Sequence, residues 1–317
     1  MNWFLGIDTS NYTTSVALCP QEGECLGRRR LLPVPPGEKG LRQSQALFAH
    51  TKALPALIDS LRPAWAGGRL QAVGVSAYPR TAADSYMPCF LAGVSVAAST
   101  AAFFNVPLYV FSHQQGHLAA ARQGSGMPPE KTYLAFHLSG GTLELLQVQG
   151  EQIQPLCVAG DITLGQLIDR CGVKLGLGFP CGPALEELAL KSSRSYTVNI
   201  PCRQGRVNLS GLENRWEALR QEGAPPEDLA KFVFDCVCQC VATMLAQAPA
   251  LPVLFMGGVA SSALLRQALA GPDRYFSPAS HSQDNALGTA LLAREVFLQG
   301  LPDQTPLLVT RGLIEKL

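Results

Sequence analysis

The sequence predicts an α/β fold built from two domains that repeat one structural pattern. Three observations lead to this prediction. Apolar strand patterns alternate with helix patterns along the chain. A strand, turn and strand at residues 3–18 recur at residues 133–148, which suggests a duplicated fold. The 317 residues also exceed what one hydrophobic core usually holds, so two domains are expected.

The first half of the chain contains the elements of one such domain. Two strands, at residues 3–8 and 15–18, enclose a turn that is rich in hydroxyl groups. Further elements follow from apolar residues at helical spacing or in short continuous runs. They are a helix at residues 44–61, a strand at 70–76, a buried helix at 91–104 and a strand at 108–111.

The second half repeats the pattern with glycines in its turns. Strands at residues 133–138 and 143–148 enclose a Ser-Gly-Gly-Thr turn, whose glycines allow a phosphate to approach the backbone closely. A strand at residues 252–256 then leads into Gly257, Gly258 and a helix. A ligand can lie there against bare backbone, close to the helix N-terminus.

Two histidines follow the strand at residues 108–111. Ser112 and Gln115 predict a helix start, because each side chain can bond to the other residue's backbone amide in a capping box. His113 and His117 then stand four residues apart on one helical face, where they can share a metal ion if a third ligand comes from elsewhere. Without that ligand they are better explained as polar residues at a helix end, since the glutamate of the H-E-x-x-H motif is missing.

The composition limits the possible partners and compartments. With 25 basic and 24 acidic residues the net charge is +1, so any RNA contact would be local or shared with a partner. The one basic run, residues 28–30, is expected to be a solvated edge or loop. No apolar run is long enough to cross a membrane. The 10 cysteines are expected to be free thiols in a reducing cytoplasm, because no signal peptide precedes the first strand.

The order of these motifs resembles one protein family. Two hairpins, then a strand, paired glycines and a helix, are similar to the phosphate, phosphate and adenosine segments of the actin, Hsp70 and sugar-kinase superfamily. Within it, the series H-x-x-x-H, S-G-G, G-x-x-x-D, G-P, S-G-L, G-G-V-A and D-N-A resembles the tRNA threonylcarbamoyladenosine synthase (TsaD) family over residues 6–293. The resemblance implies a duplicated actin-like, or ribonuclease-H-like, ATPase fold of two domains with a central nucleotide cleft.

The resemblance also implies a metal site and a nucleotide site. It adds Asp284 to His113 and His117 as metal ligands, and two imidazoles with one carboxylate suit Fe(II) or Zn(II). An adenylate substrate, or ATP, would bind to residues of the second half. These residues are His137, Leu138, Ser139, Gly140, Gly141, Asp169 for a ribose hydroxyl, Gly182, Gly257, Gly258 and Ser262, which stands where the family has an adenine-contacting Asn.

The activity that the resemblance implies is metal-dependent transfer of a threonylcarbamoyl group. The group would pass from threonylcarbamoyl-AMP to the adenosine next to the tRNA anticodon, with release of AMP. The chain departs from the family at the first turn, where Tyr12 and Thr13 replace the two carboxylates of G-I-E-T-S-C-D-E-T, and at Gln115, which replaces the glutamate of H-x-E-G-H. Retained ligands among altered polar neighbours indicate a divergent paralogue.

Two other functions stay open at this stage. The chain could be a non-catalytic nucleotide-binding paralogue that serves as a partner subunit, or an ATP-dependent carbamoyltransferase that acts on a small molecule. The expected partners are tRNA, bound through a complex, and either a paralogous actin-like subunit or a second copy of the chain. The expected domains are residues 1–125 with 280–300, and residues 126–279, followed by a tail at 301–317, because Asp284 must return to the first domain to join the histidines.

Overall fold

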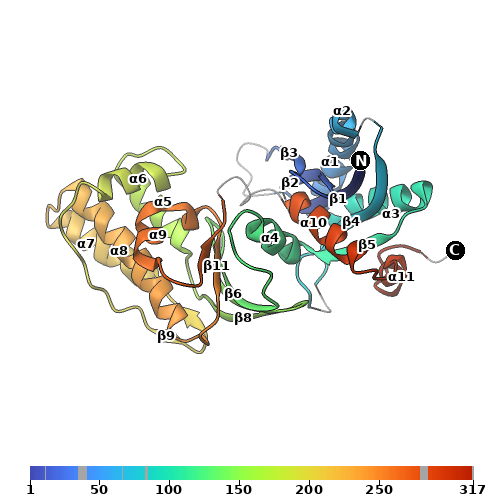
Figure 1. Cartoon of the computed structure of the whole chain (residues 1–317). Coiled ribbons are helices and arrows are strands. Elements are labelled where there is room, and N and C mark those ends of the chain that lie inside the picture. Colours follow the sequence, from blue (N-terminus) through green and yellow to red (C-terminus); the bar gives the residue numbers. More distant parts are fainter. Residues whose placement is uncertain (11, 35–40, 66, 83–84, 279–284, 316–317) are drawn as a thin grey trace. The chain divides into compact units, whose positions relative to one another are not determined.

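The computed structural model describes residues 1–10, 12–34, 41–65, 67–82, 85–278 and 285–315. The chain divides into two compact units (Figure 1). Unit 1 comprises residues 1–120 and 283–317, and unit 2 comprises residues 121–282. Each unit has its own β-sheet and its own hydrophobic core.

The sheet of unit 1 has five strands in the order β3-β2-β1-β4-β5. Strands β1 to β3 form an antiparallel meander, and β4 and β5 continue the sheet parallel to β1. Their bounds are β1 Asn2–Ser10, β2 Thr13–Pro20, β3 Leu26–Leu31, β4 Arg69–Tyr78 and β5 Leu108–Ser112. The predicted hairpin is confirmed, with longer strands and a shorter turn, since Ser10 pairs with Thr13. The basic run lies on β3, an exposed edge strand, as expected.

Helices cover both faces of this sheet. They are α1 Gln43–Asp59, α2 Arg62–Trp65, α3 Phe90–Phe104, α4 His113–Arg122, α10 Asn285–Leu298 and α11 Thr305–Thr310. Successive residues of a strand point to opposite faces, and β1 is buried on both. Ile7 belongs to a core cluster with Leu54 of α1 and Ala97 of α3. Phe4, on the same strand, points to the other face and packs against Phe297 of α10, with ring centroids 5.5 Å apart.

Glycines let α10 lie directly on the sheet. Gly6 of β1 pairs with Gly74 of β4. A Cβ atom on Gly6 would lie 2.1 Å from the Ala286 carbonyl oxygen, and one on Gly74 would lie 2.6 Å from that of Thr289. A side chain at either strand position would therefore push α10 away, and with it the polar residues that α10 brings to the ends of the strands.

The sheet of unit 2 repeats the strand order of unit 1. Its order is β12-β11-β6-β7-β8-β10-β9, so the meander β6-β7-β8 and the parallel strands β11 and β12 match β1 to β5. The bounds are β6 Thr132–Leu138, β7 Leu143–Gln149, β8 Gln152–Ala159, β9 Cys202–Arg203, β10 Arg206–Val207, β11 Val253–Met256 and β12 Arg274–Phe276. The short hairpin β9-β10 extends the copy beyond β8. This repeat of topology confirms the duplicated fold.

Five α-helices and a single 3-10 turn complete the described part of unit 2. They are α5 Leu164–Lys174, α6 Gly182–Ala189, α7 Ser210–Gln221, α8 Pro226–Leu245, the 3-10 turn Val259–Ser261 and α9 Ala263–Leu269. Trp216 of α7 is fully buried, and its indole N–H donates to the Leu229 carbonyl oxygen at 3.1 Å. Cys236 and Cys240 of α8 are buried and Cys238 is half-buried.

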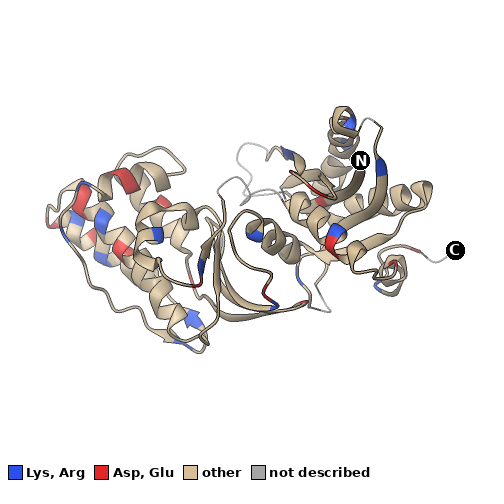
Figure 2. Cartoon of the chain, in the orientation of Figure 1, with Lys and Arg blue, Asp and Glu red and all other residues tan. Residues whose placement is uncertain are grey.

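Charges of both signs are mixed on the helices of unit 2 (Figure 2). Lys174 bridges Glu213 at 3.2 Å and Glu217 at 3.5 Å, and Arg170 contacts Glu213 at 3.1 Å. These pairs join α5 to α7 on the surface. Such pairing agrees with the near-zero net charge. It leaves the surface of α5 and α7 without a strong electrostatic potential of one sign.

Two expectations need correction. Residues 301–317 were expected to be a tail, but their described part belongs to unit 1, because Leu308 is fully buried in its core and Gln304 bonds to the edge of β5. The cysteines were expected to be free thiols, but Cys19 and Cys25 form a disulfide across the β2-β3 hairpin. A separation of 6 residues in an antiparallel hairpin brings two such side chains together.

Candidate functional site

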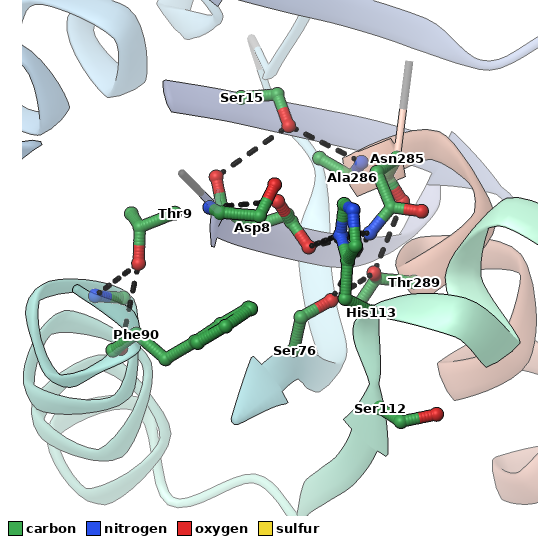
Figure 3. Close-up of polar contacts among 12 residues, drawn as sticks. Asp8, Thr9, Ser15, Ser76, Phe90, Ser112, His113, Asn285, Ala286 and Thr289 are labelled. Carbon is green, nitrogen blue, oxygen red and sulfur yellow. Dashed lines mark hydrogen bonds and ion pairs between the residues drawn. The ribbon is translucent and has the colours of Figure 1, made fainter. Parts of the chain in front are cut away.

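The carboxyl ends of three parallel strands gather polar side chains in unit 1 (Figure 3). Asp8 lies near the end of β1, Ser76 near the end of β4, and His113 directly after β5. Asn285, the first residue of α10, joins them. In open α/β sheets ligands commonly bind at this edge of the strands.

The start of α4 confirms the predicted capping box. The Ser112 hydroxyl accepts the Gln115 amide at 3.2 Å, and the Gln115 side-chain oxygen accepts the Ser112 amide at 2.8 Å. The two imidazoles lie on one helical face, with ring centroids 4.3 Å apart for His113 and His117. Gln115 therefore serves the helix start, a role that the family's glutamate could fill equally well.

His113 is held from behind by two residues. Its Nδ1 lies 2.9 Å from Asp8 Oδ2 and 2.7 Å from Asn285 Nδ2. Asp8 is only 1% exposed, and its Oδ1 accepts the Ser10 amide at 3.1 Å. Burial raises the pKa of Asp8, but the charge of His113 and hydrogen bonds from His113, Ser10 and Ser76 outweigh it, so the pKa lies well below its usual value.

Asn285 links this pair to α10 and β4. Its amide nitrogen also donates to Asp8 Oδ2 and lies 3.3 Å from the Ser76 hydroxyl. Ser76 in turn contacts the Thr289 hydroxyl at 3.1 Å. A Cβ atom on Gly116 would lie 2.7 Å from Asn285 Oδ1, so the glycine between the two histidines makes room for this amide.

The residues of unit 1 fit a divalent metal by the chemistry of their donor groups. With Nδ1 of His113 engaged by a carboxylate, Nε2 is the nitrogen that remains for a metal, an arrangement common among metal-binding histidines. The described residues contain no cluster of three or more His, Cys, Asp or Glu side chains that could hold a metal. The third predicted ligand, Asp284, lies outside the described residues.

The predicted phosphate turn of unit 2 is a closed hairpin. His137 and Leu138 end β6, and the Ser139 hydroxyl accepts the Thr142 amide at 3.0 Å. A Cβ atom on Gly140 or Gly141 would meet no heavy atom within 4 Å. Open space around both glycines is what a bound phosphate would need.

Neighbouring segments pack closely against this turn. The Thr163 hydroxyl at the start of α5 donates to the Gly140 carbonyl oxygen at 2.7 Å. Gly257 has a φ of +98°, and a Cβ atom there would lie 2.2 Å from the Leu138 carbonyl oxygen, whereas Gly258 faces open space. The structure thus brings the predicted residues 137–141 and 257–258 together at the carboxyl ends of β6 and β11.

The other predicted nucleotide residues make structural hydrogen bonds. Asp169 accepts the Cys181 amide at 2.8 Å and so holds the segment that leads into Gly182. Ser262 caps α9, and its hydroxyl donates to Glu186 of α6 at 2.6 Å. Asp169 thereby joins α5 to the start of α6, and Ser262 joins α6 to α9.

Sequence reasoning did not identify Asp8, Ser76 and Asn285 as site residues. A carboxylate inside the apolar strand Trp3-Phe4-Leu5-Gly6-Ile7 was the available signal for Asp8. In unit 2, Glu144 was also not identified from the sequence. It is a buried carboxylate directly opposite His137 in the β6-β7 ladder. Ser76 carries no local signal, because its partner lies 213 residues away, and for Asn285 the only signal was its place in the D-N-A motif, since Asp8 lies 277 residues away.

Comparison with known proteins identifies the family. A profile of the TsaD family, tRNA N6-adenosine threonylcarbamoyltransferase, matches residues 85–290. The tRNA N6-adenosine threonylcarbamoyltransferase of Thermus thermophilus is 30% identical over 312 residues, which is 95% of this chain and 94% of that protein.

Solved structures show the fold. HypF of T. kodakarensis is similar with a TM-score of 0.60 at 14% identity, covering 94% of this chain and 48% of that chain. The activator of 2-hydroxyisocaproyl-CoA dehydratase from Clostridium difficile is similar with a TM-score of 0.54 at 14% identity, covering 99% of each chain. With the repeated strand order, these similarities confirm a duplicated actin-like fold. From its sequence relatives, the chain belongs to the tRNA N6-adenosine threonylcarbamoyltransferase family.

Proposed function

We propose that this chain transfers a threonylcarbamoyl group from threonylcarbamoyl-AMP to the adenosine next to the tRNA anticodon and releases AMP. The observation that carries the proposal is the pair of imidazoles on α4, one of them held by Asp8 and Asn285, in a chain of this family. The paired imidazoles favour a metal-dependent transferase over a protein that only binds nucleotide.

We assign one divalent metal, Fe(II) or Zn(II), to His113, His117 and Asp284. Asn285, the residue that follows Asp284 in the chain, lies 2.7 Å from His113, which supports the third ligand. When bound, such an ion polarises a carbonyl or phosphoryl oxygen. The amide network behind His113 keeps its ring in place and excludes water from the Asp8 carboxylate, which is 1% exposed.

The reaction itself needs no protein nucleophile. The exocyclic amine of the adenosine attacks the carbamoyl carbon and the new carbon–nitrogen bond forms. The bond to the phosphate oxygen breaks so that AMP leaves, and the proton that the amine loses passes to solvent. The protein's task is then to position two substrates and to stabilise the leaving phosphate. We assign the adenylate to unit 2, with its phosphate at Gly140, Gly141 and Gly258, where the position that a Cβ atom would occupy is open.

The remaining nucleotide contacts follow from the family pattern. We keep Asp169 as the ribose contact through its second carboxylate oxygen, since Oδ1 already accepts the Cys181 amide. Ser262 caps α9 and bonds to Glu186, so we propose that it supports the adenine pocket through α9 rather than by direct contact.

We propose tRNA as the acceptor, bound in a complex in the cytoplasm with a paralogous actin-like subunit or a second copy of the chain. The net charge of +1 supports a shared RNA surface, since one chain of this charge attracts RNA weakly. No helix among the described residues is long and apolar enough to cross a membrane.

The decisive experiment is complementation of a strain that lacks the authentic synthase, read by the mass of the modified tRNA nucleoside. Purified protein is then incubated with threonylcarbamoyl-AMP with and without tRNA. We expect AMP release that depends on tRNA and on added metal. Release without tRNA would indicate the carbamoyltransferase for small molecules, and binding without release would indicate a non-catalytic subunit.

The matched variants are His113→Ala and Gln114→Ala, neighbours on the same helical turn. We expect His113→Ala to lose metal and transfer while it retains the circular dichroism of the wild type, because the side chain is 26% exposed and packs at the edge of the core. Gln114→Ala should keep both. Unchanged metal content in His113→Ala would count against the site.

A further inference from the structure

The geometry points to Asp8 as a positioning residue: we propose that it fixes His113 as the tautomer with a proton on Nδ1, so that Nε2 alone is presented to the metal. That Nε2 binds a metal rests on the proposed function, whereas the tautomer of His113 does not depend on it. The contacts behind the His113 ring all come from described residues of unit 1.

Counting hydrogen atoms decides between the two tautomers. The Asn285 amide has two hydrogens but three neighbours: Asp8 Oδ2, Ser76 Oγ and His113 Nδ1. If the hydrogens go to Asp8 and Ser76, Nδ1 carries its own proton and donates it to Asp8. If one goes to Nδ1 instead, the ring nitrogen's lone pair and the carboxylate oxygen face each other at 2.9 Å. The first arrangement leaves no hydrogen between Asn285 Nδ2 and His113 Nδ1, which lie 2.7 Å apart. It is favoured because the buried carboxylate only accepts, so it needs a proton on the nitrogen that faces it at 2.9 Å.

The rest of the network agrees with the first arrangement. Ser76 accepts from Asn285 and lies 3.1 Å from Thr289 Oγ1, and Thr289 donates to the Asn285 carbonyl oxygen at 3.0 Å. Reversing the Asn285 amide would place two oxygens together at Asp8, so the orientation of the amide is fixed. Asp8 accepts N–H donors at both oxygens, because Oδ1 takes the Ser10 amide. It is therefore an acceptor toward Nδ1 as well.

Burial gives the two edges of the imidazole different surroundings. The Nδ1 edge faces Asp8 and Asn285, which are 1% and 4% exposed, while the His113 side chain keeps 26% of its surface exposed (Figure 3). A neutral histidine in water favours the other tautomer only weakly, so one buried charged acceptor is enough to reverse the preference. A carboxylate at this distance also makes Nε2 a better ligand.

The first test observes the tautomer directly in metal-free protein. Protein labelled with ¹⁵N-histidine is recorded by long-range proton–nitrogen correlation, and His113 is identified by its loss in His113→Gln. We expect a protonated Nδ1 and an unprotonated Nε2 in the wild type, and loss of this preference in Asp8→Asn. Asp8→Glu, which restores a carboxylate, should recover it in part. A protonated Nε2 in the wild type would overturn the inference.

The second test measures metal affinity by competition of Zn²⁺ or Co²⁺ with a chromophoric chelator. We expect Asp8→Asn to bind about 10- to 100-fold more weakly with unchanged stoichiometry. Asp161→Asn, a carboxylate of unit 2 that also accepts backbone amides, should bind like the wild type. Equal affinity of Asp8→Asn and wild type overturns the inference. A wild type that binds no metal but shows the Nδ1 proton would reject the proposed function alone.

Discussion

Asp161 is a single side chain that ties three backbone amides together. Its Oδ1 accepts the amides of Ile162 at 2.6 Å and Leu209 at 2.8 Å, and its Oδ2 accepts that of Ser210 at 3.0 Å. Burial raises the pKa of Asp161, whereas hydrogen bonds from the Ser210 hydroxyl and from these amides lower it. The hydrogen bonds have the larger combined effect, so the pKa lies below its ordinary value.

This pKa shift predicts a stability difference that depends on pH. A carboxylate whose pKa is lowered by folding stabilises the protein above its unfolded pKa of about 3.9, and this contribution disappears as the pH falls through the folded pKa. We expect Asp161→Ala to lose about 0.5–1 kcal/mol at pH 7, the low end for a lost cap, because Asp161 is exposed and solvent screens its charge. Denaturant unfolding at pH 7, 5, 4 and 3 should show the difference narrowing below about pH 4. A difference that stays constant to pH 3 would contradict this role.

Contacts between single residues were predictable from the sequence only where both partners lie close together in the chain. The capping box of Ser112 and Gln115 was predicted correctly because both partners lie within one helical turn. The Asp8 and Asn285 contact joins residues 277 positions apart, and nothing in either local sequence indicates the other. The placement of His113 and His117 on one face followed from their spacing, whereas the residues behind His113 required the fold.

At the scale of elements, α10 depends on close backbone contacts. A Cβ atom on Gly288 would lie 1.8 Å from the Gly116 carbonyl oxygen and 2.8 Å from the Ala120 amide nitrogen. These neighbours are backbone atoms of α4 and cannot rotate away. The glycine pair therefore sets the distance between the helix that carries the histidines and the helix that carries Asn285.

We predict that Gly288→Ala destabilises the protein by about 1–3 kcal/mol, because α10 must shift to accommodate the methyl group. The control is Gly211→Ala in α7, where a Cβ atom meets nothing within 4 Å and alanine favours the helix. Urea unfolding at pH 7 should separate the two variants. Equal urea midpoints of unfolding for Gly288→Ala and wild type would show that α4 and α10 can accommodate the methyl group without cost.

Elements differed in how far the sequence predicted them. The strands at the centre of each sheet are continuous apolar runs, and they were placed within a few residues of their observed bounds. The helix α11 was missed because residues 305–310 contain a proline and no helical period, and packing of Leu307 and Leu308 against the core of unit 1 holds them. Packing against the core, and not the intrinsic helix preference of these residues, determines this helix.

At the scale of the whole molecule, unit 1 is built from two separate stretches of chain. The sheet of residues 1–120 leaves the face around Phe4, Gly6 and Gly74 to be covered by α10. Unit 2, by contrast, is one continuous stretch with its own core of buried residues.

This arrangement predicts different behaviour for fragments. A fragment of residues 121–282 should unfold cooperatively, because it contains all of the unit 2 core. A fragment of residues 1–120 should expose apolar surface, bind a hydrophobic dye and aggregate, and adding residues 283–317 through a flexible linker should restore cooperative unfolding. Circular dichroism melts of the three fragments would test this. A cooperative melt of residues 1–120 alone would contradict it.

The return of α10 to the first sheet has a consequence for synthesis on the ribosome. Translation delivers residues 1–120 before residues 283–317, so their sheet lacks its covering helix until α10 emerges. The stretch made second can finish folding before the stretch made first. A chaperone that shields nascent chains would therefore be needed longest by the half of the protein that carries the histidines.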